Sequence, residues 1–400
     1  MMESVQGGVT APIGFAASGV SCGIKRRGKD LALIVSNRPA AVAGTLTTNR
    51  LRAPCVDWAE KILRLGKARA IVANSGNANC CTGRRGERDC RSMAEWTAGA
   101  LGVPAQEVLV ASTGVIGQPL PMEKLRKGIR AARGQLTRTG SHSAAEAILT
   151  TDTSPKEIAV HWKIGGCVAM VGGIAKGSGM IAPNMATMLA FLTTDLQADA
   201  GLLRETLREV VPDTFNAITV DGEMSTNDMV LLMANGGTGL PPLKRGTKVH
   251  KDFLEAVRTV CRHLAREIVR DGEGVTRIFT VRVTSAAGRA EALKVARQVA
   301  NSLLVKTMVA GRDPNWGRIA AAAGASGVLF RPERLTIRLG KKIVFQKGEP
   351  ARLSRAILLQ QVDHPEVRIE LDLGRGKAEA SLLSGDLTEG YVKINAKYTT

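Results

Sequence analysis

Aromatic side chains are scarce in this chain of 400 residues, because phenylalanine, tryptophan and tyrosine together make up only 3% of it. Proteins that bind single-stranded nucleic acid by stacking its bases need aromatic platforms, so the scarcity argues against that class. The core must be packed mainly from aliphatic side chains, since 44% of the residues are hydrophobic. A chain of this length is expected to form two or three structural units.

Histidine is also rare, and the five histidines are scattered without metal-ligand spacing at positions 142, 161, 250, 263 and 364. A Ser-His-Asp or Cys-His enzyme needs a histidine base, and no sequence feature identifies any of the five histidines as such a base. A Walker A motif is missing too. The segment Gly177–Ala182 fits G-x-G-x-x-A, but Pro183 follows where a helix should propagate, which argues against a dinucleotide site.

Paired cysteine motifs and long apolar runs are missing as well. The seven cysteines contain no C-x-x-C pair, and their odd number with an adjacent Cys80-Cys81 is typical of free thiols in a reducing compartment. The N-terminal residues lack the pattern of a signal peptide, and the longest small-apolar tract, Ile319–Phe330, is too short to span a bilayer. We therefore expect a cytoplasmic protein that does not enter a membrane.

Positive charge is in excess, because 55 Lys and Arg against 36 Asp and Glu give a net charge of +19. The cations occur in short clusters such as Lys25-Arg26-Arg27 and Lys341-Lys342, without a sustained run. A nucleic-acid-binding protein usually concentrates its charge on one face or tail, so a solvated surface is the favoured reading. The nucleic-acid alternative predicts salt-sensitive DNA or RNA retention and an uncut chain. A positive field would also assist the capture of small anions.

The most informative stretch for function runs from Val168 to Asp195, VAMVGGIAKGSGMIAPNMATMLAFLTTD. Its start predicts a strand that ends in a glycine-rich loop carrying Lys176, and Pro183-Asn184 predicts a turn. A second buried segment then opens at Ala186-Thr187. The Thr187 hydroxyl has two readings, a satisfied core threonine, which is the commoner case, or a nucleophile.

Apolar patterning along the chain predicts a mixed α/β protein. Strands are expected at residues 31–35, 40–48, 68–73, 108–111, 168–174, 217–220, 278–283, 306–310, 367–373 and 378–382, with a strand-like pattern continuing through 391–396. Helices are expected at residues 91–102, 122–133, 143–149, 201–211, 251–271, 290–304 and 319–323.

Polar tracts follow several of these elements, where sites often lie, at residues 74–79, 112–117, 150–153, 221–228 and 271–276. Ser112-Thr113-Gly114 can present a hydroxyl and a backbone N–H to a developing oxyanion, and Glu273 is well placed to meet a cationic group. Each tract also has a plainer reading as a capped turn or a solvated loop. The carboxylates at 221–228 do not match the EF-hand spacing, so a structural loop is favoured over a metal site.

A threonine nucleophile without a histidine can use its own amine as the base. Cutting the peptide bond before Thr187 would free an α-amine that titrates near pH ~8, close enough to cellular pH for general-base work. The same hydroxyl could make the cut by attacking the carbonyl of Ala186, whose small side chain leaves that carbonyl accessible.

The segment GGIAKGSGMIAPNMATMLAFLTTD resembles the self-cleavage signature of the ornithine acetyltransferase family. Seven further blocks resemble the family in order along essentially the whole chain: GIKRRGKDLALI, IVANSGNANCCTG, VLVASTGVIG, LTTDTSPK, TVDGEMSTND, LVKTMVAGRDPNWGRI and GDLTEGYVKINAKYTT. Two departures are mild, since Ala182 stands where histidine is common and Met224 makes its loop less polar.

The resemblance implies roles for individual residues. Thr187 would be the nucleophile and Ala186–Thr187 the bond cleaved, while Thr113 and Gly114 would form the oxyanion hole. The substrate site would be lined by Thr150, Lys176, Thr187, Glu273, Asn395 and Thr400. Glu273 suits the ornithine ammonium, and Lys176 suits an anionic or carbonyl oxygen.

The resemblance also implies an activity and an architecture. Acetyl would pass from N2-acetyl-L-ornithine to L-glutamate through an acetyl-threonine, with acetyl-CoA as a possible co-substrate and without a cofactor or metal. An αββα sandwich, residues 1–280, would carry a smaller α/β domain, residues 281–400. The cleaved chains, 1–186 and 187–400, would assemble as an α2β2 heterotetramer. The alternative is a self-processing aminopeptidase or amidohydrolase of the related type, in which water accepts the acyl group.

Overall fold

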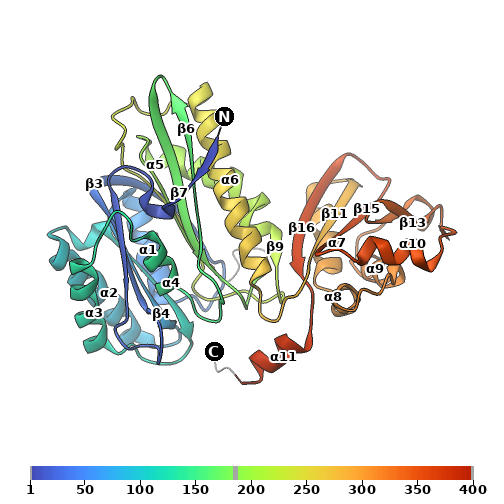
Figure 1. Ribbon diagram of the computed structural model, residues 1–400, viewed down its shortest axis with the longest axis horizontal. Coiled ribbons are helices and arrows are strands. Elements are labelled where there is room, and N and C mark those ends of the chain that lie inside the picture. Colours follow the sequence, from blue (N-terminus) through green and yellow to red (C-terminus); the bar gives the residue numbers. More distant parts are fainter. Residues whose placement is uncertain (1, 183–187, 398–400) are drawn as a thin grey trace.

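The structure, a computed structural model, describes residues 2–182 and 188–397, and these form two β-sheets with helices packed around them (Figure 1). The helices are α1 (Pro54–Leu65), α2 (Gly83–Leu101), α3 (Met122–Gly134), α4 (Ser141–Ala147), α5 (Ala200–Val210), α6 (Lys248–Arg270), α7 (Arg289–Ala300), α8 (Leu303–Ala310), α9 (Trp316–Gly324), α10 (Arg355–Val362) and α11 (Glu389–Asn395). None of the helices in this described part is long and apolar enough to cross a membrane.

The larger sheet has nine strands in the order β1-β6-β7-β8-β10-β3-β4-β5, with β2 paired to β3. Their bounds are β1 (Glu3–Val5), β2 (Phe15–Val20), β3 (Leu31–Leu46), β4 (Lys67–Asn77), β5 (Val108–Val115), β6 (Lys156–Ile164), β7 (Cys167–Lys176), β8 (Leu189–Thr194) and β10 (Met229–Ala234). The long strand β3 pairs with β2 through its first half and with β10 through its second, and its register on β4 shifts between Val35 and Ala40. It therefore joins two halves of the sheet.

Helices cover the outside of both halves, which gives the αββα sandwich that the family resemblance implies. Helices α1 to α3 pack on β3 and β5, and α6 packs on β6 and β7. Strand β8 shows why the layers separate, because successive side chains of a strand point to opposite faces. Leu189 and Phe191 join the apolar cluster shared with β3 to β5, whereas Ala190 and Leu192 join the cluster shared with α5 and α6.

The smaller sheet has seven strands in the order β14-β13-β12-β15-β11-β16-β9, and α7 packs on β11 and β16. Its strands are β9 (Ile218–Thr219), β11 (Ile278–Ala286), β12 (Thr336–Leu339), β13 (Lys342–Gln346), β14 (Glu349–Pro350), β15 (Glu366–Asp372) and β16 (Ala378–Gly385). Most of it lies in the C-terminal region, but β9 comes from much earlier in the chain. The predicted boundary between residues 280 and 281 falls within β11 and stays a prediction.

Two predicted strands are wrong. Residues 306–310 belong to helix α8, which Ser302 caps by accepting a hydrogen bond from the N–H of Val305 at 3.3 Å. The strand-like pattern at 391–396 is helix α11, capped in the same way by Thr388. The β-branched residues that suggested strands are overridden by the capping residues before them. The two strands predicted at 31–35 and 40–48 are one continuous strand, β3.

Candidate functional site

A small cavity of about 170 Å³ lies where the ends of β5 and β7, the loop before β10, the turn after α6 and helix α11 come together. Six of the residues predicted for the site line it: Thr113, Gly114, Thr150, Lys176, Glu273 and Asn395. The other three, Ala186, Thr187 and Thr400, lie outside the described residues. A larger cleft of about 1070 Å³, between α6 and β15, contains none of them, so the smaller cavity is the candidate site.

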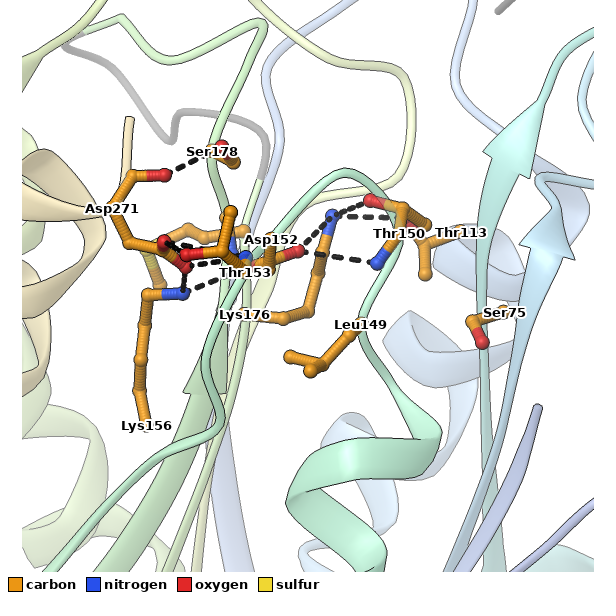
Figure 2. A network of polar contacts seen from close by, with 12 residues as sticks. Ser75, Thr113, Leu149, Thr150, Asp152, Thr153, Lys156, Lys176, Ser178 and Asp271 are labelled. Carbon is orange, nitrogen blue, oxygen red and sulfur yellow. Dashed lines mark hydrogen bonds and ion pairs between the residues drawn. The ribbon is translucent and has the colours of Figure 1, made fainter. Parts of the chain in front are cut away.

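Lys176 ends strand β7 and is 2% exposed. Its ammonium donates to the Thr150 hydroxyl at 2.8 Å and, over a longer 3.4 Å, to the Thr113 hydroxyl (Figure 2). A hydroxyl that accepts from an ammonium keeps its own hydrogen free to donate elsewhere. Burial lowers the pKa of Lys176, and the neighbouring Asp152 carboxylate opposes that change. The arrangement presents a cation and two hydroxyls on one side of the cavity.

Gly114 lies next to Thr113 near the end of β5, opposite Gly76 of β4. Its φ is +130°, and a Cβ at this position would come within 2.4 Å of the carbonyl carbon of Gly76. Only glycine fits such a close approach of two backbones. The glycine thus lets the backbone at Thr113-Gly114 reach the cavity wall, as an oxyanion hole built from this pair would require.

Glu273, in the turn after α6, also lines the cavity and is 7% exposed. Its carboxylate accepts a hydrogen bond from the Asn395 side-chain amide of α11 at 2.7 Å. Asp221 and Glu223 also line the cavity, and burial together with these three carboxylates raises the pKa of Tyr391 to about 12. The cavity therefore has an acidic pole at Glu273 and a basic pole at Lys176, which suits a ligand carrying both charges.

The polar loop at 221–228, predicted to be structural, fixes the neighbouring backbone and also lines the cavity with Asp221, Glu223, Ser225, Thr226 and Asn227. Asp221 accepts hydrogen bonds from the backbone N–H groups of Met180 and Ile181, and Asp228 accepts one from Met188 at 2.9 Å. Burial raises the pKa of both carboxyls. The loop thus holds the chain on either side of residues 183–187. Within residues 2–182 and 188–397, no group of three or more His, Cys, Asp or Glu side chains is arranged so that it could hold a metal ion.

A buried network behind Lys176, formed by Asp152, Lys156 and Asp271, is not among the features predicted from the sequence. The tract at 150–153 is predicted to be a cap or turn, and the Asp152 carboxylate accepts a hydrogen bond within it from the N–H of Thr150 at 3.1 Å. Lys156 bridges the carboxylates of Asp152 and Asp271 at 2.8 and 2.6 Å. Because Asp271 is 115 residues away from Lys156 in sequence, spacing gave no signal for the pairing.

Together, the fold and the cavity define an αββα sandwich protein with a small, two-pole site for a charged molecule. The family model described as "ArgJ family" matches residues 16–400. The chain is 49% identical over 402 residues to the arginine biosynthesis bifunctional protein ArgJ of Symbiobacterium thermophilum, covering 100% of both chains. It is 48% identical over 402 residues to the protein of the same description from Gloeobacter violaceus, covering 100% of this chain and 99% of the relative.

Among solved structures, the ornithine acetyltransferase of Mycobacterium tuberculosis, described as complexed with ornithine, is 41% identical to the part it matches. The match covers 46% of this chain and 98% of that chain, with a TM-score of 0.43. The family model and the full-length identities place this chain in the ArgJ family.

Proposed function

We propose that this protein is an acetyltransferase of arginine biosynthesis that moves acetyl from N2-acetyl-L-ornithine to L-glutamate. The observation that carries the proposal is the convergence of six family-predicted residues on one cavity with an acidic and a basic pole. Acetylornithine carries a carboxylate and a side-chain ammonium, so it matches both poles. Membership of the ArgJ family, whose relatives are described as bifunctional proteins, supports acetyl-CoA as a second acetyl donor for glutamate.

The chemistry begins with the bond between Ala186 and Thr187. Its cleavage frees the α-amine of Thr187, which takes the proton of the threonine hydroxyl as that oxygen attacks the acetyl carbonyl. The Thr113 hydroxyl and the Gly114 N–H donate to the resulting oxyanion, and Lys176 supplies positive charge beside them. Ornithine leaves with the proton as its free amine, and the acetyl group stays on the Thr187 oxygen as an ester.

The second half of the cycle reverses the first with a different amine. Glutamate enters the same cavity, its α-amine attacks the ester carbonyl, and N-acetylglutamate leaves while the proton returns to the Thr187 oxygen. Glu273 and Asn395 bind the ornithine side chain, and Thr150 and Thr400 complete the substrate site. The reaction needs neither a metal nor a cofactor. The cleaved chains, 1–186 and 187–400, assemble as an α2β2 heterotetramer in the cytoplasm.

A denaturing gel and initial rates test this proposal. Wild-type protein should run as two fragments, 1–186 and 187–400, and its rates with acetylornithine and glutamate should give parallel double-reciprocal lines. Thr187→Ala protein should run as one band and lose transfer, because it lacks the nucleophile. A Thr187→Ala protein that still splits and still transfers acetyl at the native rate contradicts the mechanism, and intersecting lines contradict the acetyl-enzyme.

The acceptor separates transfer from hydrolysis. With wild-type protein and acetylornithine, release of ornithine should depend on glutamate and should be accompanied by an equal amount of N-acetylglutamate. Release of ornithine and acetate at the same rate without glutamate would instead assign the protein to the self-processing hydrolases. Replacing acetylornithine with acetyl-CoA in the same assay tests the second donor.

A further inference from the structure

Behind the basic pole of the cavity, four buried charges alternate in sign: Lys176, Asp152, Lys156 and Asp271 (Figure 2). Their side chains are 3%, 0%, 1% and 10% exposed, respectively. The Lys176 ammonium lies 3.8 Å from Asp152 Oδ2, and Lys156 holds Asp152 Oδ1 and Asp271 Oδ2 at 2.8 and 2.6 Å. The row contains two cations and two carboxylates, so it is neutral as a whole.

Such a row is an expensive way to fill a core. Removing charges from water carries a large desolvation penalty, and well-packed apolar residues often stabilise a fold as well or better. Stability alone therefore does not account for it. Its position gives another reason, because only the Lys176 end of the row reaches the cavity, while Asp152 and Lys156 do not line it.

The Asp152 carboxylate holds three separate parts of the basic pole. It accepts from the N–H of Gly177 at 2.7 Å and from the N–H of Thr150 at 3.1 Å, and it faces the Lys176 ammonium. Thr150 is in turn the closest partner of that ammonium, at 2.8 Å. One carboxylate thus sets the backbone on both sides of the Lys176–Thr150 contact.

The other end of the row leads to the acidic pole. The Asp271 carboxylate accepts from the N–H of Thr153, and its backbone oxygen accepts from the Ser178 hydroxyl at 2.6 Å. The Ser178 carbonyl accepts from the N–H of Glu273 at 3.0 Å. The row therefore ties the turn after α6, which carries Glu273, to the end of β7, which carries Lys176.

We propose that Asp152 and Lys156 are positioning residues of the acetyl transfer, which hold the Lys176 ammonium in place at the cavity. The inference rests on the proposed function and adds two residues that do not touch the substrate. Asp152 favours the charged form of Lys176 because it is an adjacent anion, whereas Lys156 disfavours it because it is a second cation nearby.

Other charged groups also face Lys176, and they affect its pKa together with Asp152 and Lys156. Burial lowers its pKa most strongly, Asp152 raises it, Lys156 lowers it, and Asp228 and Glu273 raise it. Lys25, whose ammonium donates to the carbonyl of Leu149 at 2.9 Å, is a further cation close enough for Lys176 to lower its pKa. These other groups stay in place when Asp152 or Lys156 is replaced, although Asp152→Asn also removes an anion that raises the pKa of Lys25.

The test is the pH profile of kcat/KM for acetylornithine in single variants. Asp152→Asn should move the alkaline limb to lower pH by about one unit and lower the plateau about 100-fold, because the ammonium loses both its anion and its alignment. Lys156→Gln should move the same limb to higher pH, because it removes a competing cation. The titration of the substrate's own ammonium is common to every variant and cancels in the comparison.

Asp195→Asn is the matched control. Asp195 is 0% exposed and accepts two backbone hydrogen bonds, from Ile13 and Met170, but it follows the far end of β8 from Lys176. This variant should be less stable than wild type, but the alkaline limb of its kcat/KM profile should stay at the wild-type pH. A purely structural role for the row predicts that Asp152→Asn and Lys156→Gln behave like the control, and this result would overturn the proposal.

If Asp152→Asn fails to fold, the double variant Asp152→Asn/Lys156→Gln replaces it. The alkaline limb of its kcat/KM profile should lie at lower pH than that of Lys156→Gln alone. Equal limbs in these two proteins would overturn the positioning role. A wild-type protein without acetyl transfer would overturn the proposed function itself, whereas an active wild type with unshifted variants overturns only the roles of Asp152 and Lys156.

Discussion

Glu273 shares its space with a residue that has no side chain. A Cβ on Gly179 would lie 2.5 Å from the carboxyl carbon of Glu273, far inside van der Waals contact. The carboxylate also accepts a hydrogen bond from the Asn395 amide, and displacing the carboxylate would disturb that bond. Gly179 is therefore part of the acidic pole, because its lack of a side chain leaves space for the Glu273 carboxylate.

Gly179→Ala should push the Glu273 carboxylate out of place and lower kcat/KM for acetylornithine about tenfold or more. The matched control is Gly99→Ala inside α2, where an added Cβ meets nothing within 4 Å. That variant should keep wild-type kinetics and gain about 0.5–1 kcal/mol of stability, since alanine is the better helix former. Unchanged kinetics in Gly179→Ala would show that the acidic pole tolerates displacement of Glu273.

Asp152 should also affect how the free energy of unfolding depends on pH. Burial works to raise its pKa, but Lys176 and Lys156 outweigh burial and lower the pKa to about 2. A carboxylate with a depressed folded pKa stabilises the fold above its unfolded pKa of about 3.9, and this contribution is lost as pH falls through the folded value. Between about pH 5 and pH 2, wild type should lose on the order of 2 kcal/mol more unfolding free energy than Asp152→Asn. Denaturant titrations across this range check it, and parallel losses would contradict the depressed pKa.

Among the elements, those with strong periodicity were predictable and the site's framework was not. The apolar face of α6, the apolar start of β7 and the alternating pattern of β11 predict these elements within a few residues. Helix α11 was misread because Tyr391, Val392 and Ile394 have strand propensity, and a short segment carries too little pattern to overrule it. The site's loops could be found one by one, since each follows a predicted element. Which loops meet, and which buried charges pair behind them, depends on tertiary contacts, of which Lys156–Asp271 and Asn395–Glu273 join residues more than a hundred positions apart.

Helix α11 should serve the site more than the fold. Its residues are largely exposed, and its Asn395 amide reaches Glu273. Asn395→Ala should raise KM for acetylornithine about tenfold, the cost of one hydrogen bond to a charged group, with little change in kcat or melting temperature. Lys393→Ala on the same helix is the control, because the ion pair of Lys393 is with Glu389 within α11. Equal KM values in the two variants would mean that α11 does not hold Glu273 in the working enzyme.

At the scale of the whole molecule, the net charge of +19 is not required by any contact in the cavity, where acidic and basic poles oppose each other. Its effect is on the approach of substrates. A strongly positive protein raises the local concentration of anions, and added salt screens that field. The two amino-acid substrates differ in this respect, because glutamate has a net negative charge and acetylornithine is neutral overall.

The two substrates of one enzyme thus provide their own control. Raising ionic strength from about 0.05 M to about 0.5 M should lower kcat/KM for glutamate about two- to tenfold, and should change kcat/KM for acetylornithine by less than a factor of about two. In a ping-pong cycle these two constants are measured separately, so a general effect of salt on the protein would appear in both. Equal sensitivity would mean that the positive charge serves something other than substrate capture. A difference confined to glutamate would tie the basic surface to the second half of the cycle, in which the anion must reach an already acetylated threonine.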